Sequence, residues 1–220
     1  MGLGDWISGA VSATIDCVSK VISSSITKVL PTIGTILEKG LEILETVCKI
    51  AEVVARIYNI FKAEERTEEI GDRAIQAGEQ GITPDKFDKF EDYMEKIRNF
   101  PLDPEKSKDI RLEQKLTAGL FVATKGLDDK FNTPEGTMGN LWLLSACKPE
   151  YFTAERLKSI LDQTPNISAA FKYFEGTLAP AEILDTKKQL INAEKALDPG
   201  KDDKTIYAEL DSASKAVQGK

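Results

Sequence analysis

The chain has 220 residues, of which 41% are hydrophobic and 30% are charged, and its formal net charge is −7. This length supports one large or two small domains with a buried core, and the net negative charge argues against binding nucleic acid through phosphate neutralisation. The chain contains no histidine, which excludes Ser-His and Cys-His nucleophile pairs, the HExxH zinc helix and carboxylate-histidine di-iron sites.

The cysteines and the N-terminus bear on the cellular compartment. Cys17, Cys48 and Cys147 are far apart and lie in apolar helical patterns, so we predict buried thiols in a reducing compartment rather than a disulfide framework. No basic region precedes the first apolar stretch, and Asp5 lies where a positive charge would be expected. We therefore predict synthesis in the cytoplasm without a signal peptide, and any export to a membrane by a non-classical route.

The hydrophobic periodicity predicts an all-α fold with a long N-terminal helical hairpin, helix–Pro31–helix, packed with or tethered to a C-terminal multi-helix bundle. In domain terms, we expect an apolar helix pair over 1–62, an acidic linker helix over 63–83 and a helical bundle over 84–220. The expected helices cover residues 4–29, 32–62, 63–79, 84–99, 104–124, 134–147, 153–162, 165–175, 180–197 and 203–217.

Four helix starts are predicted from an N-capping side chain followed by proline at the first helical position. These signals are Thr83-Pro84, Asp103-Pro104, Thr133-Pro134 and Thr164-Pro165. Ala179-Pro180 is a weaker version of the same signal.

The predicted helix over 32–62 carries its charges in one thin stripe. Spacings of four and three keep the stripe within roughly 80° of the helix surface, while the rest of the helix is mainly apolar. The stripe consists of Glu38, Glu42, Glu45, Lys49, Glu52 and Arg56. The preceding helix is also amphipathic, with an apolar face opposite serines and threonines.

The sequence is compatible with two arrangements of the N-terminal helix pair. In the first, the apolar arc packs within the protein and the charged stripe faces water, with Glu45–Lys49 and Glu52–Arg56 as ion pairs along the helix. In the second, several copies insert into a membrane and the stripe lines a water-filled lumen. The candidate lumen residues are then Glu42, Glu45, Lys49, Glu52 and Arg56, with Trp6 as an interfacial anchor. A lone lipid-facing helix is unfavourable because of the charges within Leu41–Phe61.

The second arrangement predicts a membrane-active protein, namely a bacterial pore-forming or membrane-perturbing effector toxin that stays soluble until its N-terminal helices insert. Its partners would be a lipid membrane and further copies of itself. The alternative is a soluble helical interaction or adaptor protein whose partner covers the apolar N-terminal helices. Neither hypothesis requires a cofactor, a metal or catalytic residues.

A third hypothesis comes from the acidic residues after the stripe. Glu64, Glu65 and Glu68 form an EExxE spacing near Asp72, and Asp88, Glu91, Asp92 and Glu95 follow on a later helix. Over about thirty residues this resembles the paired acidic helices of the all-α NTP pyrophosphatases. The resemblance implies Mg²⁺ held by carboxylates and hydrolysis of a nucleoside triphosphate.

Overall fold

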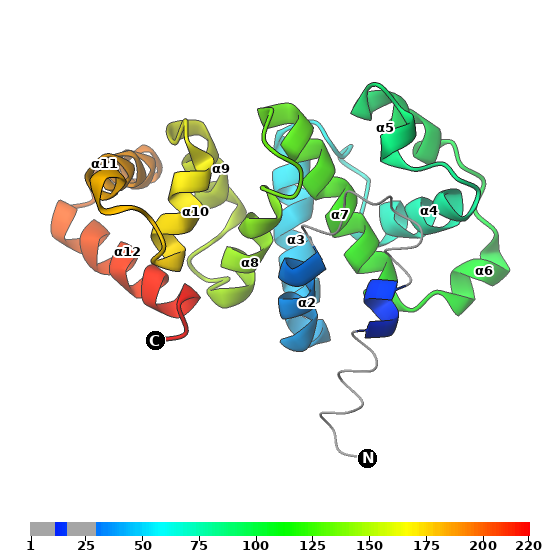
Figure 1. Ribbon diagram of the computed structural model, residues 1–220, viewed down its shortest axis with the longest axis horizontal. Helices are drawn as coiled ribbons and strands as arrows, with labels where there is room; N and C mark the ends of the chain where they lie inside the picture. The colour runs from blue at the N-terminus through cyan, green and yellow to red at the C-terminus, as the bar shows by residue number, and fades with distance from the viewer. Residues whose placement is uncertain (1–11, 17–29) are drawn as a thin grey trace, which may run out of the picture. The chain divides into compact units, whose positions relative to one another are not determined.

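The computed structural model describes residues 12–16 and 30–220, and within these residues the chain forms helices, turns and loops without a β-strand (Figure 1). The all-α fold predicted from the sequence is confirmed. Residues 12–16 are helical. The other elements are α2 (Leu30–Glu38), α3 (Leu41–Ile57), α4 (Thr67–Glu79), the 3-10 helix η2 (Pro84–Lys86), α5 (Phe90–Arg98), α6 (Pro104–Asp109), α7 (Leu112–Phe131), α8 (Gly139–Cys147), α9 (Ala154–Gln163), α10 (Ile167–Glu175), α11 (Pro180–Leu197) and α12 (Asp203–Val217).

The predicted N-terminal hairpin differs in detail from the structure. The first helix, over 4–29, lies outside the described residues except at 12–16, and Pro31 lies in the first turn of α2. The prediction of one continuous helix over 32–62 is wrong, because the helix is interrupted at Gly40 and α3 ends at Ile57. Gly40 has φ 102°, a backbone conformation that is open to glycine and strained for other residues.

Three later helices are also shorter or more broken than predicted. The segment 104–124 is interrupted at Ile110 and Arg111, which are extended, and α7 then continues to Phe131. The segment 84–99 forms η2 and, after a gap, α5. The segment 134–147 is helical only from Gly139, because Asp128 accepts hydrogen bonds from the backbone N–H groups of Gly136 and Met138 at 2.6 and 2.9 Å.

Of the four predicted capping signals, one forms as expected. Asp103 accepts hydrogen bonds from the backbone N–H groups of Glu105 and Lys106 and caps α6. The Thr83 side chain makes no capping hydrogen bond, and the Thr133 hydroxyl donates to Asp128 instead of capping a helix. The cap of α10 is Asn166, two residues after Thr164.

The chain forms two compact units, Met1–Leu143 and Leu144–Lys220. This division falls within α8. The domain boundaries near residues 62 and 83 that the sequence suggested stay a prediction. The segment expected to be an acidic linker contains α4, whose Ile70, Ala74, Ile75 and Ala77 are buried. Whether residues 1–62 fold apart from the rest stays a prediction.

The first unit is organised around α7 (Figure 1). This helix is buried almost continuously from Leu116 to Thr124, and α3, α4 and α5 pack against it. Burial on all sides explains why α7 lacks a polar face in its middle, as expected for the central helix of a core.

Helices α4 and α7 approach each other very closely. A Cβ atom on Gly71 would lie 1.8 Å from the backbone oxygen of Lys115, and a Cβ atom on Gly119 would lie 2.0 Å from that of Thr67. The two helices therefore touch backbone to backbone, which only glycine at both positions permits. Beside this crossing, Lys115 Nζ lies 3.0 Å from Asp72 Oδ2, and Thr67 donates to the backbone oxygen of Cys48 on α3 at 3.4 Å.

The end of α7 is held by a buried carboxylate. Asp128 is 2% exposed and accepts from the Thr133 hydroxyl at 2.9 Å as well as from Gly136 and Met138. Burial raises the pKa of Asp128 to about 6, although these hydrogen bonds and the charge of Lys125 act to lower it.

The second unit packs α9 against α11 and α10 against both α11 and α12. Its core contains edge-to-face aromatic pairs, with the ring centroids of Phe152 and Phe174 5.0 Å apart. Phe171, Leu190 and Leu210 are also buried. This small core positions the site described below.

The α4–α7 crossing leads to a prediction for Gly119→Ala. The added methyl group overlaps the backbone of Thr67, so the helices must separate, and we expect the free energy of unfolding to fall by more than about 3 kcal/mol. Gly34→Ala in α2 is the matched control, because its Cβ would lie 3.5 Å from Ile15 Cδ1, an ordinary contact. That control should change stability by less than about 1 kcal/mol, in the stabilising direction. Urea unfolding measures both, and equal effects would contradict the close crossing.

A second prediction concerns pH. Because the pKa of Asp128 is raised in the folded chain, its contribution to stability is complete below about pH 4 and is lost as the pH rises through about 6. Wild-type stability relative to Asp128→Asn should therefore fall by about 1 kcal/mol between pH 5 and pH 7. Urea unfolding at pH 5, 6 and 7 tests this difference, and parallel curves for the two proteins would contradict it.

Candidate functional site

The charged stripe predicted as lumen-lining lies on the outer side of α3. Glu42 and Lys49 are exposed, and Glu45, Glu52 and Arg56 are partly buried. Trp6 lies outside the described residues. The apolar arc of the same helix faces the interior of the first unit, through Leu44, Val47, Cys48, Ala51, Val54 and Ala55.

Two stripe residues hold α3 to the start of α4. Glu52 Oε1 accepts from the backbone N–H of Thr67 at 2.8 Å, where the α4 N-terminus has no cap of its own. Arg56 Nη2 lies 3.5 Å from Glu52 Oε2, as the sequence predicted, and donates to the backbone oxygen of Glu65 at 2.6 Å. The stripe thus contributes to the packing of the first unit. Among the described helices, none has the length and apolar content needed to cross a bilayer.

Two of the acidic residues that resemble a pyrophosphatase site form ion pairs with basic side chains. Glu65 pairs with Arg98 at 2.6 Å, and Asp72 pairs with Lys115 at 3.0 Å. Within residues 12–16 and 30–220, no three acidic or cysteine side chains converge in a way that could hold a metal ion. The geometry therefore gives no support to the Mg²⁺ hypothesis.

A large cavity lies in the second unit, beside α12. It has a volume of about 710 Å³ and is open to solvent. A second cavity of about 470 Å³ continues along α12 and shares Lys148, Glu150 and Ser212 with the first. We call the two together the α12 basin. Its lining residues are Cys147, Lys148, Glu150, Tyr151, Arg156, Asp202, Lys204, Thr205, Ala208, Glu209, Asp211, Ser212, Lys215, Ala216 and Lys220.

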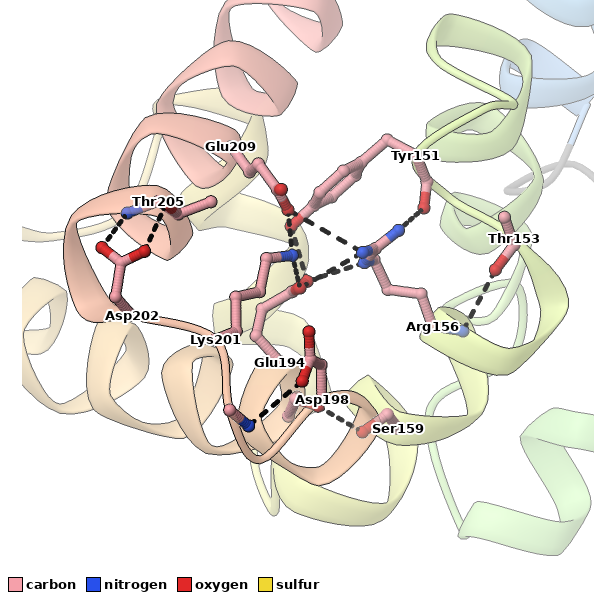
Figure 2. Close-up of polar contacts among 12 residues, drawn as sticks. Tyr151, Thr153, Arg156, Ser159, Glu194, Asp198, Lys201, Asp202, Thr205 and Glu209 are labelled. Carbon is pink, nitrogen blue, oxygen red and sulfur yellow. Dashed lines mark hydrogen bonds and ion pairs between the residues drawn. The ribbon is translucent and has the colours of Figure 1, made fainter.

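One wall of the basin is held by a buried ion network around Glu194, shown in Figure 2. Glu194 is 2% exposed and accepts from Tyr151 Oη at 2.8 Å, from Arg156 Nε at 2.7 Å and from Lys201 Nζ at 3.1 Å. Glu209 on α12 also pairs with Lys201, and it lies 3.9 Å from Arg156. The network joins α9 to α11 through Glu194, and it reaches α12 through Glu209.

The network is electrostatically balanced. Burial alone would raise the pKa of Glu194, but the hydrogen bond and the charge of Arg156 bring this pKa below its ordinary value, so the carboxylate is ionised at neutral pH. Burial and the nearby Glu194 charge raise the pKa of Tyr151, which stays protonated and donates. The Arg156 guanidinium also lies over the Tyr151 ring, 4.1 Å from its centroid, and donates to the Tyr151 backbone oxygen. These groups stabilise one another and are fixed in place.

Most of the lining that α12 contributes consists of short side chains. Thr205, Ala208, Ser212 and Ala216 recur every three or four residues and so share one helix face. Lys148 Nζ donates to Ser212 Oγ at 2.5 Å where the two cavities meet.

No family model, curated protein or solved structure matches this chain. Its function is therefore inferred from the geometry and charge of its own residues. In the α12 basin, both charge signs, hydroxyl groups and small side chains surround an open space, which suits binding of a polar ligand.

This site was not predicted from the sequence, because its residues come from four separate segments. One signal was present in α11, where Glu194 falls between Leu190 and Leu197 on an otherwise apolar helix face. A charge at such a position indicates a buried partner of opposite sign. The sequence does not show that the partners are Arg156 and Lys201.

The network leads to a third prediction, for Glu194→Gln. This change leaves Arg156 and Lys201 without their buried counter-charge, so the free energy of unfolding of the second unit should fall by about 3 kcal/mol at pH 7. Asp211→Asn is the control, because its pair with Lys215 is exposed and should contribute less than about 0.5 kcal/mol.

The pH dependence gives an independent check. The lowered pKa of Glu194 adds stability that is present above about pH 4.5 and is lost on further acidification, so this acid-dependent loss should shrink in Glu194→Gln. Thermal unfolding at pH 7 and pH 4, followed by circular dichroism, measures both effects. A variant as stable as Asp211→Asn would show that the network is dispensable.

Proposed function

We propose that this chain is a helical, non-catalytic protein that binds an extended polypeptide segment in the α12 basin. The observation that carries the proposal is the basin itself, two adjoining cavities of about 710 and 470 Å³ beside a buried ion network. This corresponds to the interaction-protein hypothesis from the sequence, with the partner now assigned to the second unit instead of the N-terminal helices.

The shape of the basin supports an extended occupant. The small side chains from Thr205 to Ala216 follow α12 over eleven residues, or about 16 Å. A fully extended chain spans the same distance with about five residues. Shallow, solvent-open cavities along a helix suit such a strand-like segment better than a compact small molecule.

The charges of the basin support a partner that carries both signs. Arg156 and Glu209 are engaged in the ion network, and Asp202 caps α12 by accepting from the backbone N–H of Thr205 at 3.0 Å. Lys204 and Glu150 form no ion pair within the described part of the chain and remain available to a ligand. Polar groups at such positions give orientation and specificity more than raw affinity.

The network supports binding over catalysis. A general base must be able to exchange its proton at the operating pH, whereas Glu194 is held ionised by its cations and Tyr151 is held protonated. With no histidine in the chain, the basin offers rigid recognition groups rather than an activated nucleophile.

The pore hypothesis remains a second proposal, and it requires α3 to leave its position against α7. Its specific support is that α2 and α3 are joined at Gly40, where added atoms would meet nothing within 4 Å, so this junction is open. Insertion would have to withdraw the apolar arc of α3 from α7 and break the contact from Glu52 to Thr67.

The fourth prediction tests the proposed function directly. The full chain is used to select binders from a library of random twelve-residue peptides, and each binder is measured by fluorescence anisotropy. Ala208→Trp fills the basin with a ring, so affinity should fall at least about tenfold, since about 1.4 kcal/mol of lost contact suffices. Ala196→Trp is the matched control, because Ala196 is also exposed but lies on α11 outside the basin.

Two outcomes would contradict the proposal. Selected peptides that bind both variants equally, or a selection without enrichment, would remove the basin as the binding site. Release of a small dye from anionic liposomes by the full chain between pH 5 and 7.5 would favour the pore. Glu45→Gln with Lys49→Gln should then alter the ion selectivity of that leak.

A further inference from the structure

A separate cavity lies in the first unit, between the end of α3, helix α5 and the last turns of α7. Its volume is about 290 Å³, and it is more enclosed than the α12 basin. The lining residues are Tyr58, Asn59, Ile60, Phe90, Glu91, Met94, Arg98, Gly126, Asp129 and Lys130. This cavity plays no part in the proposed function.

The inner wall of the cavity is apolar. Ile60, Phe90 and Met94 are 5%, 8% and 2% exposed. Tyr58 adds a second aromatic ring, which is held edge-on to Phe131 at a centroid distance of 4.9 Å. An organic group entering the cavity would therefore meet two aromatic rings and two aliphatic side chains.

The shape of the cavity depends on two backbone features. A Cβ atom on Gly126 would lie 2.6 Å from Ile60 Cγ2 and 2.7 Å from Phe90 Cε1, so glycine leaves these side chains in place as the wall. Asn59 has φ 61°, a left-handed conformation that turns the chain sharply after α3. A cavity that persists in an otherwise close-packed core is a candidate ligand site.

The charge at the cavity is negative once the internal ion pairs are counted. Arg98 is neutralised, because it binds both carboxylate oxygens of Glu65 at 2.6 and 3.1 Å and donates to the backbone oxygen of Ile60 at 2.9 Å. Glu91, Asp129 and Lys130 are exposed and form no ion pair within the described chain, so they leave a net charge of −1 at the opening.

Helix ends add to this negative field. The cavity lies at the C-terminal ends of α3 and α7, where the partial negative charge of the helix dipole is concentrated. The N-terminal end of α5, with the opposite polarity, already carries Glu91 and Asp92. The C-terminal ends of α3 and α7 therefore favour a cation, and Asp92, which lies outside the cavity lining, offsets the positive end of α5.

We propose that this cavity binds an organic ammonium ion with a small apolar body. The apolar body lies against Phe90 and Met94, and the ammonium group lies near Asp129 and Glu91, within reach of the Tyr58 ring for a cation–π contact. The proposal does not depend on the α12 basin, so either can fail alone.

The fifth prediction is measured by NMR titration of the uniformly ¹⁵N-labelled full chain with 2-phenylethylamine, which is protonated at pH 7. Amide signals of Asn59 and Gly126 should shift with a dissociation constant on the order of 1 mM, as expected for a ligand of this size. The neutral analogue 2-phenylethanol and the anionic phenylacetate should each bind at least about fivefold more weakly.

Charge variants separate specific binding from general hydrophobic contact. Glu91→Gln combined with Asp129→Asn should weaken amine binding about fivefold, while Lys130→Gln should strengthen it about twofold. Glu95→Gln, an exposed residue on α5 outside the cavity, is the matched control and should leave binding unchanged. Equal binding of the amine and the alcohol, an unaffected double variant, or the absence of shifts at about 20 mM amine would each overturn the proposal.

Discussion

The contact between the backbones of α4 and α7 sets the geometry of the first unit. Gly71 and Gly119 bring the two helices together without side chains between them, and the other helices take their positions from this pair. Cys48 on α3 lies beside Thr67 at the same level, and Lys115 pairs with Asp72 next to it. Because α7 is enclosed on several sides, its own sequence is mainly apolar in the middle, where Thr124 accepts a hydrogen bond from Trp142 Nε1 on α8 at 2.7 Å.

The second unit is arranged around a charge rather than a close backbone contact. Glu194 collects donors from Tyr151, Arg156 and Lys201, and thereby fixes three segments that a small apolar core would hold less firmly. The same contacts leave the basin rigid and polar. In both units the buried polar groups restrain the chain next to a cavity, which is a suitable arrangement for recognition without a large conformational change.

The sequence predicted the helical elements well, because apolar periodicity and proline positions are local signals. It predicted the break points poorly. The helix break at Gly40 and the late start of α8 depend on a backbone angle and on the carboxylate of Asp128, which lies several residues upstream. The stripe on α3 was identified from the sequence, and its lumen-lining role stays a prediction. The contact from Glu52 to Thr67 was not predicted, because these two residues are fifteen apart in the chain. The basin was missed for the same reason, since Glu194 and Arg156 are thirty-eight residues apart.

The burial of Cys48 makes this thiol a probe of local opening of the core. This thiol faces the backbone of α7, and burial with the nearby glutamates raises its pKa well above the ordinary value, so it is inert while α3 stays in place. Alkylating reagents reach such a sulfur only when local opening exposes it. The rate at which Cys48 is alkylated therefore measures how often this opening occurs. The reactivity of this one side chain thus reports how often α3 detaches from the core, which is information on dynamics that the structure alone does not give.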